Sequence, residues 1–209
     1  DTDVDNDALT VTAISIPGVT NPQVGSPITL TSGILTLNAD GSYTFDPAEN
    51  FNGSVPVITY TVSDGTTTVN STLTITVDSV NDNPVAVADS KSTNEDTLLS
   101  INVANGLLAN DSDLDGDTLT VSSFSVAGAT NPQLNTNITL ASGVLNIKAD
   151  GSYTFNPAAN FNGNVPQVTY SISDGNGGTA SSTLDITVNA INDAPIAVAD
   201  TDDTDEDTL

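Results

Sequence analysis

The sequence contains no cysteine, histidine, methionine or tryptophan among its 209 residues. Without cysteine there is no disulfide and no thiol chemistry, and without histidine the serine–histidine and cysteine–histidine catalytic sites are excluded. Histidine-ligated zinc and iron sites are excluded for the same reason. A secreted β-protein that has no disulfides can use metal ions to hold its loops together.

Positive charge is also nearly absent. Only Lys91 and Lys148 are basic, against 27 acidic residues, and the formal net charge is −25. Nucleic acids and anionic membranes both need a basic patch on their partner, so neither is expected to bind. No apolar run approaches the ~18 residues of a membrane span, so we expect no membrane insertion. The chain has no visible signal peptide and does not begin with methionine, so we interpret it as part of a longer protein.

The acidic residues are mostly of one kind. Only Glu49, Glu95 and Glu206 are glutamate, and the others are aspartate, often close to asparagine and glycine. This composition suits tight loops that coordinate a hard cation through oxygen atoms. The alternative is an acidic surface that is simply solvated.

The chain repeats itself after about 110 residues, the sign of a tandem array. Asp1–Val11 returns as Asp111–Val121, and Asn81–Pro84 returns as Asn192–Pro195 after one inserted residue. We therefore predict a β-sandwich repeat that lacks its opening strands at 1–83, a complete repeat at 84–194, and the opening strand of a third repeat at 195–209.

The complete copy has short alternating segments between turn signals every 8–12 residues or so, and no helical period. We predict its first strand at Pro84–Asp89 and its second at Thr97–Val103. Further strands are predicted at 119–126, 138–140, 144–148, 152–155, 168–172 and 182–188. In roughly 110 residues this pattern indicates an all-β protein made of tandem Greek-key β-sandwiches of the immunoglobulin type, with seven to eight strands per repeat.

The aromatic residues occupy equivalent places in both copies, and we predict that they are core anchors. In the complete copy they are Tyr153, Phe155, Phe161 and Tyr170. Carbohydrate binding usually needs exposed aromatic rings, so this pattern does not favour it.

Two acidic segments are candidate cation-binding sites. Asp78–Pro84 is a short, acidic, proline-closed joint between repeats, and we predict that it binds calcium. Asp111-x-Asp113-x-Asp115-Gly116 has the spacing of the first half of an EF-hand loop, but position twelve is Ser122 and no helices flank it. The EF-hand is therefore excluded, while alternate aspartates beside glycine still indicate a cation site. The alternative is an aspartate-rich turn whose side chains cap its own backbone.

Over the whole unit the chain resembles the bacterial cadherin-like tandem repeats of giant, calcium-dependent surface adhesins of the repeats-in-toxin type. Asp78–Pro84 resembles the linker between cadherin domains, and Asp111-x-Asp113 resembles the cadherin DxD motif. The other segments that carry the resemblance are Asn110–Val121, Asp150–Phe155, Asn160–Gly163, Tyr170–Gly175 and Ile191–Pro195.

The resemblance implies a set of Ca²⁺ ligands at the first joint. Asn81 and Asp82 would supply side-chain oxygens and Asn83 its carbonyl, while the following domain and an acidic motif of the preceding domain would supply the rest. The implied set is Asp46, Glu49, Asp78, Asn81, Asp82, Asn83, Asp111, Asp113 and Asp174.

Two further sites are implied. At the next joint Glu95, Asn192 and Asp193 remain, but Asp46, Glu49 and Asp78 are replaced by uncharged residues, so we expect weaker binding there. Asp1, Asp3 and Asp64 would belong to an upstream joint, where a cation would be under-coordinated.

The function implied is structural. The resemblance predicts a calcium-rigidified extender of a large bacterial cell-surface adhesin, secreted and extracellular, which spaces a distal binding domain from the cell. Its partners would be neighbouring repeats of the same chain, with homotypic contacts possible. We do not expect an enzyme, because the acidic loops are duplicated with the repeat. Two alternatives stay open: a self-associating filament module that uses strand donation by residues 195–209, and a ligand-binding adhesion module.

Overall fold

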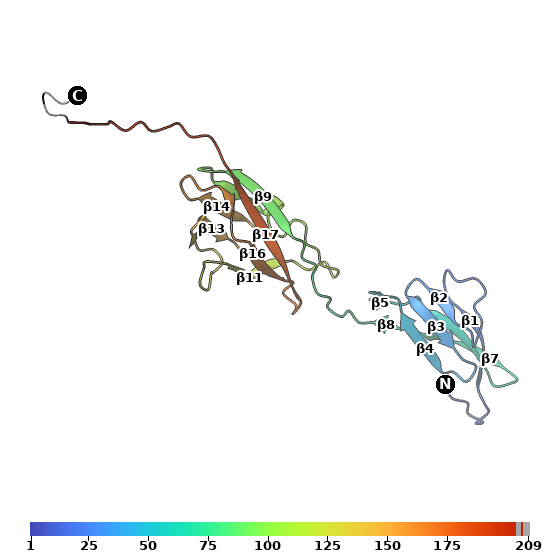
Figure 1. Ribbon diagram of the computed structural model, residues 1–209. Helices are drawn as coiled ribbons and strands as arrows, with labels where there is room; N and C mark the ends of the chain where they lie inside the picture. Colours follow the sequence, from blue (N-terminus) through green and yellow to red (C-terminus); the bar gives the residue numbers. More distant parts are fainter. Residues whose placement is uncertain (204–205, 207–209) are drawn as a thin grey trace. The chain divides into compact units, whose positions relative to one another are not determined.

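The computed structural model describes residues 1–203 and 206, and its regular elements there are β-strands and one short 3₁₀ turn. The chain divides into two compact units, Asp1–Val80 and Asn81–Leu209. Both units are built from β-sheets whose strand pairs are antiparallel, except for one parallel pair in the second unit (Figure 1). No helix among the described residues has the length and hydrophobicity needed to cross a bilayer.

The first unit contains eight strands in three sheets, ordered β1-β6-β7, β2-β3-β4 and β5-β8. The strands are β1 (Thr10–Ser15), β2 (Ile28–Leu30), β3 (Gly33–Leu37), β4 (Tyr43–Pro47), β5 (Gly53–Ser54), β6 (Ile58–Ser63), β7 (Thr68–Leu73) and β8 (Thr76–Val77).

The second unit contains nine strands in two sheets, ordered β10-β14-β13-β12 and β11-β16-β17-β15, with β9 also paired to β17. A 3₁₀ turn, η1 (Val103–Asn105), follows β10. The strands are β9 (Asp89–Asn94), β10 (Leu99–Ile101), β11 (Thr120–Val126), β12 (Ile138–Leu140), β13 (Gly143–Ile147), β14 (Tyr153–Pro157), β15 (Gly163–Asn164), β16 (Val168–Ser173) and β17 (Thr179–Asn189).

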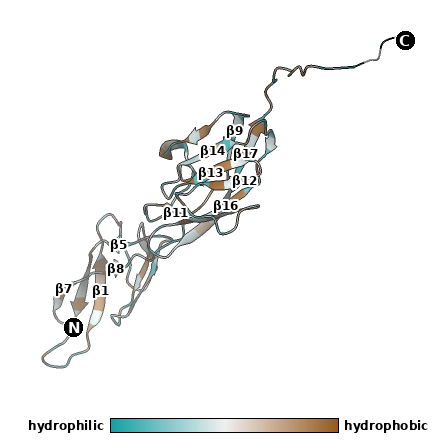
Figure 2. Cartoon of the chain, turned by 90° about the vertical axis from the view of Figure 1, so that its left-hand side faces the viewer, coloured by the Kyte–Doolittle hydropathy of each residue, from teal (hydrophilic) through white to brown (hydrophobic). Residues whose placement is uncertain are grey.

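The core of the second unit lies between its two sheets. Val168, Tyr170 and Ile172 alternate along β16 and are fully buried, and Leu145 and Phe155 face them from the other sheet. Figure 2 shows the hydrophobic residues gathered on the strands. Burying each large side chain contributes about 1.5–3 kcal/mol, so this interior is the main source of stability. The predicted all-β sandwich is confirmed.

The first strand of the second unit was placed wrongly by the sequence. Of residues 84–88 only Val85 pairs, in a single bridge to Ser112, and the strand begins at Asp89 as β9. The sequence of β9 is polar and has no hydrophobic alternation, because it is an edge strand held by parallel backbone pairing of Asp89–Asn94 with Leu184–Asn189. Figure 1 shows β9 lying along β17.

The prediction that the aromatics are core in both copies fails for Tyr43, whereas Phe45, Phe51 and Tyr60 pack against the core of the first unit. Tyr153 and Phe155 are 1% and 0% exposed, whereas the equivalent Tyr43 is 50% exposed and Phe45 is only partly buried. The difference has a structural cause. β10 pairs with β14 in the second unit, but the sheet β2-β3-β4 of the first unit ends at β4.

Replacing Tyr170 with phenylalanine should destabilise the second unit. The Tyr170 hydroxyl donates to Asp89 Oδ2 (2.8 Å) and lies within hydrogen-bond distance of the carbonyl oxygens of Val87 (3.0 Å) and Leu107 (3.4 Å). Losing it removes this donor from the partly buried Asp89 carboxylate, at a cost of about 1–3 kcal/mol. We expect urea unfolding to show this loss for the transition of the second unit.

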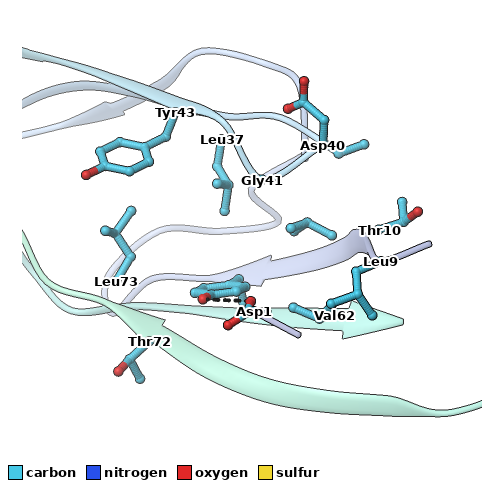
Figure 3. A pocket seen from close by; sticks show the side chains of 13 residues that line it. Asp1, Leu9, Thr10, Leu37, Asp40, Gly41, Tyr43, Val62, Thr72 and Leu73 are labelled. Atoms are coloured by element: carbon cyan, nitrogen blue, oxygen red, sulfur yellow. Dashed lines mark hydrogen bonds between the residues drawn. The ribbon is translucent and has the colours of Figure 1, made fainter. Parts of the chain in front are cut away.

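The matched control is Tyr60→Phe in the first unit. Within residues 1–203 and 206 its hydroxyl hydrogen-bonds only the exposed Asp1 carboxylate, at 3.1 Å (Figure 3). The expected change is within about 0.5 kcal/mol, as for most surface substitutions. Equal losses in the two variants would contradict the assignment of Tyr170 as an anchor for the opening segment.

Residues 195–203, predicted to open a third repeat, form no strand and are exposed, as Ile196 (90%) and Val198 (80%) illustrate. The rest of that segment, apart from residue 206, lies outside the described residues. The third repeat stays a prediction.

Candidate metal centre

The second unit contains a compact aspartate loop, Asp111–Asp117, between η1 and β11. Asp113 Oδ1 accepts hydrogen bonds from the backbone N–H groups of Asp115 (3.0 Å) and Asp117 (3.2 Å), and this fixes the loop. Backbone capping of this kind is the alternative to cation binding that the sequence left open. It uses only one of the two carboxylate oxygens.

The remaining oxygens point to a cation. Asp111 Oδ1 accepts a hydrogen bond from the N–H of Val87 at 2.8 Å. Asp111 Oδ2 and Asp113 Oδ2 are both buried and have no hydrogen-bond partner within the described part of the chain. A buried carboxylate oxygen without a partner is costly, and such groups are normally paired or coordinate a metal. The loop therefore suits a cation better than it suits an empty turn.

Asp113, Asp115 and Asp117 add to this argument. One carboxylate oxygen from each lies within 4.8 Å of the others, the one such group of three within residues 1–203 and 206. At that separation each pair of charges repels by roughly 1 kcal/mol in water and about 4 kcal/mol at an effective dielectric of 20. Oxygen-only ligands at this density are those that Ca²⁺ prefers.

The linker residues reach the same loops. Asn81 Nδ2 donates to Asp174 Oδ2 (2.8 Å), and the backbone N–H of Asp82 donates to Asp115 Oδ2 (2.8 Å). Asp174 is buried, and its Oδ1 accepts from the N–H groups of Asn176 and Gly178. The hydrogen bond from Asn81 is the main cause that lowers the pKa of Asp174, with these backbone donors adding to it. Asp174 is thus a carboxylate held in its charged form.

A family model for the bacterial cadherin-like domain matches residues 1–79 and again residues 81–190. The chain belongs to the bacterial cadherin-like domain family. The two matched ranges meet at the linker, next to the aspartate loop of the second unit.

Two solved structures of one protocadherin share this fold at low sequence identity. Human protocadherin-24 EC1-2 in its form II is 20% identical with a TM-score of 0.54, and the match covers 92% of this chain and 85% of that one. A second structure of human protocadherin-24 EC1-2 has a TM-score of 0.51 at 20% identity, covering 91% and 86%. Mouse cadherin-23 EC22-24 is 13% identical with a TM-score of 0.48, covering 88% and 53%. None of the curated proteins matches significantly.

The structure brings together part of the predicted ligand set of the cadherin-like joint. Asn81 and Asp82 meet the loops that carry Asp111, Asp113 and Asp174, all within the second unit. Asn83 also lies there, with its Oδ1 3.0 Å from where a Cβ on Gly178 would be. The remaining predicted ligands, Asp46, Glu49 and Asp78, lie exposed in the first unit, and their role stays a prediction.

Two aspartates of the carboxylate group were not among the ligands predicted from the sequence. Asp115 and Asp117 belong to the carboxylate group of the loop, and Asp117 Oδ2 also accepts from Asn176 Nδ2 at 2.7 Å. The signal was available, because the alternation Asp111, Asp113, Asp115 continues one step further to Asp117. The partly buried hydrogen bond between the Tyr170 hydroxyl and Asp89 had no such signal in the sequence.

At the other end of the second unit Glu95 is only 6% exposed. Its Oε1 accepts from the backbone N–H of Ile191 and its Oε2 from Asn162 Nδ2. Glu95 therefore anchors the start of the next linker directly. Asn192 and Asp193 are exposed. The role of Glu95, Asn192 and Asp193 as ligands stays a prediction.

In the first unit Asp3 repeats the geometry of Asp113, since its Oδ1 accepts from the N–H groups of Asp5 (2.8 Å) and Asp7 (3.1 Å). Asp64 accepts from both the N–H and the hydroxyl of Thr67 and of Thr66, and these bonds, that of the Thr67 hydroxyl first, lower its pKa strongly. Asp1 accepts from the hydroxyl of Tyr60. None of these three acids has a buried carboxylate oxygen without a hydrogen-bond partner, unlike Asp111 and Asp113. Their role as ligands of an upstream joint stays a prediction.

Burial of carboxyl groups gives the stability of the metal-free second unit an unusual dependence on pH. Desolvation raises the pKa of Asp89 and Asp111 above their ordinary value of 3.8. A raised pKa in the folded state means that folding favours the protonated form of the carboxyl group. The contribution of these two groups to stability is therefore present below pH 3.8 and is lost as pH rises through their pKa values in the folded state. For Asp174 the pKa is lowered, so its contribution is present above pH 3.8 and is lost as pH falls further.

We therefore expect the second unit in chelator to be most stable near pH 4 and to weaken toward neutral pH. Excess calcium should reverse the trend above pH 4, because a cation favours the charged form of Asp111. Thermal unfolding from pH 3 to pH 8, with chelator or with excess calcium, measures both curves. If the melting temperature followed the same curve against pH with chelator and with calcium, the placement of the cation at Asp111 would be contradicted.

Proposed function

We propose that the chain is a calcium-rigidified extender module of a large, secreted bacterial cell-surface adhesin, an adhesin of the repeats-in-toxin type. In this role it spaces a distal binding domain from the cell, and its work is structural rather than enzymatic. Membership of the bacterial cadherin-like family supports an adhesion module. The observation that carries the calcium requirement is the pair of buried, unpartnered oxygens of Asp111 and Asp113.

The residues present fit a Ca²⁺ ion. Asp111, Asp113 and Asp174 offer carboxylate oxygens, and Asp115 and Asp117 add two more within the same loops. Asn81, Asp82 and Asn83 would contribute from the linker. When bound, calcium supplies positive charge and six to eight coordination positions for oxygen. Five carboxylates at one end of a unit form an anionic ligand set dense enough to need that charge.

The placement beside a linker gives the ion its mechanical role. In this proposal Asp78, Asp46 and Glu49 of the first unit complete the coordination, so the ion joins residues on both sides of the linker. Without calcium the carboxylates repel one another and the joint flexes. With calcium the repulsion is removed and the joint is fixed. Extracellular calcium modules bind with dissociation constants of about 10⁻⁴–10⁻³ M, so the joint would be loose in a calcium-poor cytosol and stiff outside.

The two joints of the chain provide a matched test. Asp82 and Asp193 occupy equivalent linker positions, but only Asp82 meets an aspartate loop within the described residues, through its N–H bond to Asp115. We expect Asp82→Asn to weaken calcium binding at least tenfold in a calorimetric titration. Asp193→Asn should change the dissociation constant for calcium by less than about twofold, because its joint has fewer anionic ligands.

Both variants remove one negative charge from an exposed or partly exposed linker position, so a general charge effect would alter them equally. Equal weakening would mean that calcium is attracted only by the overall charge of the chain. No calcium heat in the unmodified chain would overturn the proposal as a whole.

A further inference from the structure

The first and the last strand of the second unit lie side by side and run in the same direction. β9 pairs with β17 in parallel over six consecutive residue pairs, from Asp89↔Leu184 to Asn94↔Asn189. Among residues 1–203 and 206 no other two strands pair in parallel. Figure 1 shows β9 and β17 next to each other along their length. The two ends of the unit are therefore joined directly by backbone pairing.

The direction of these two strands decides how they respond to tension along the chain. The chain enters the pair at Asp89, the start of β9, and leaves it at Asn189, the end of β17. Because the strands are parallel, these two points lie at opposite ends of the pair. Tension along the chain therefore pulls the strands so that they slide past each other. All the backbone hydrogen bonds of the pair resist sliding together, because they are evenly spaced along a parallel ladder.

Glu95 extends the contact between the two ends beyond the last strand pair. Its backbone N–H donates to the carbonyl oxygen of Asn189 at 2.9 Å. Its side chain is buried, and Oε1 accepts a hydrogen bond from the backbone N–H of Ile191. Asn162 Nδ2 donates to the other carboxylate oxygen at 3.3 Å and helps to hold the side chain in place. The segment that follows β9 thus also holds the segment that follows β17.

The two strands are held in the unit in different ways. β17 also pairs with β16 and β15 on its other edge, and Leu184, Ile186 and Val188 bury their side chains along it. β9 has no buried residue, and two of its six residues are partly buried. Under tension β17 therefore stays in the sheet and β9 is the strand that must give way. Since β9 is held by its backbone more than by packing, its resistance depends on the direction of the load.

We propose that β9 and β17 form a load-bearing clamp, which keeps the second unit folded when the chain is under tension. The clamp consists of the six parallel pairs and the contacts of Glu95 with Asn189 and Ile191. It rests on the proposed extender function only for the source of the tension. It goes beyond that function because it needs no calcium, and it would stand if the joint between the units bound none.

The test pulls the second unit of the full chain in two directions with optical tweezers. The chain has no cysteine, so introduced cysteines fix the points at which the handles attach. Ala190→Cys, directly after β17, is combined with Ala88→Cys, directly before β9, or with Asn94→Cys, at the end of β9. All three positions are exposed. The first combination makes the strands slide, and the second opens the pair from one end.

Both combinations attach within the second unit, so the linker and its proposed calcium ligands carry no load. At equal loading rates in excess calcium, we expect the sliding direction to need at least about twofold more force to unfold the unit. The reason is that forced unfolding is governed by the rate of unfolding, which here depends on whether the hydrogen bonds break together or one after another. Equal unfolding forces in the two directions would overturn the proposal.

A second comparison removes hydrogen bonds from β9 itself in the sliding direction. Backbone N–H groups alternate between the two edges of a strand, so one of two adjacent residues must direct its N–H toward β17. Lys91→Pro with Ser92→Pro removes both N–H groups, whereas Lys91→Ala with Ser92→Ala keeps them. We expect the proline variant to unfold at the force of the opening direction and the alanine variant at the force of the unmodified clamp. Equal forces for these two variants would also overturn the proposal. The comparison of directions needs no proline, so it decides the matter even where the proline variant does not fold.

Discussion

Replacing Asp113 with asparagine should abolish the calcium response of the second unit and leave its metal-free fold intact. The Oδ1 atom of asparagine can still accept the hydrogen bonds that Asp113 receives from the N–H groups of Asp115 and Asp117. The second oxygen, which is buried without a partner, becomes an amide nitrogen that cannot bind a cation. The substitution therefore separates the capping role of the side chain from its proposed role as a ligand.

The expected size of the effect follows from mass action. At a calcium concentration ten times the dissociation constant, one site stabilises the folded state by about 1.4 kcal/mol. For a domain of this size that corresponds to roughly 5 °C or more in melting temperature per site. We expect calcium to raise the melting temperature of the second unit by at least this amount in the unmodified chain. The rise should be absent in Asp113→Asn.

Asp3→Asn is the matched control, because Asp3 caps Asp5 and Asp7 as Asp113 caps Asp115 and Asp117. It should leave the calcium response of the second unit unchanged. If Asp113→Asn melts at a much lower temperature than the unmodified chain in chelator, its carboxylate has a structural role that we have not assigned. If its calcium-induced rise is intact, the ion binds elsewhere.

Calcium should also narrow the range of positions that the two units adopt. The proposed ligands come from Asp46, Glu49 and Asp78 on one side of the linker and from the aspartate loop on the other. The loop alone places three carboxylates within 4.8 Å of one another. Their repulsion opposes a fixed joint until a divalent cation offsets it. The largest change expected for the chain is therefore in its inter-unit motion.

The repeat made much of this fold predictable. Alternation along segments such as Val168–Ile172 located the core strands, and the equivalent turns in both copies set the domain pattern. β9 could not be found in this way, because an edge strand is held by backbone hydrogen bonds and its polar side chains need no pattern. Tyr43 was misplaced for a related reason, since its burial depends on an opening segment rather than on its own sequence context.

The candidate site, like the fold, could be predicted only in part from the sequence. The spacing of Asp111 and Asp113 was enough to indicate a cation, because alternate aspartates beside glycine place several oxygens on one loop. The pattern could not show which oxygens are already used by the backbone. That distinction singles out Oδ2 of Asp111 and of Asp113, and it requires atomic positions. The contact between Asp82 and Asp115 is likewise invisible in the sequence, since 33 residues separate them.

The most direct test is the distribution of distances between spin labels on the two units, measured by pulsed electron paramagnetic resonance. Gln23→Cys and Gln133→Cys place labels at exposed, equivalent turns, and the chain has no other cysteine. We expect a broad distribution in chelator and a narrow one in excess calcium, with Asp113→Asn staying broad in both. A distribution that is equally broad, or equally narrow, with and without calcium would contradict calcium rigidification of the joint.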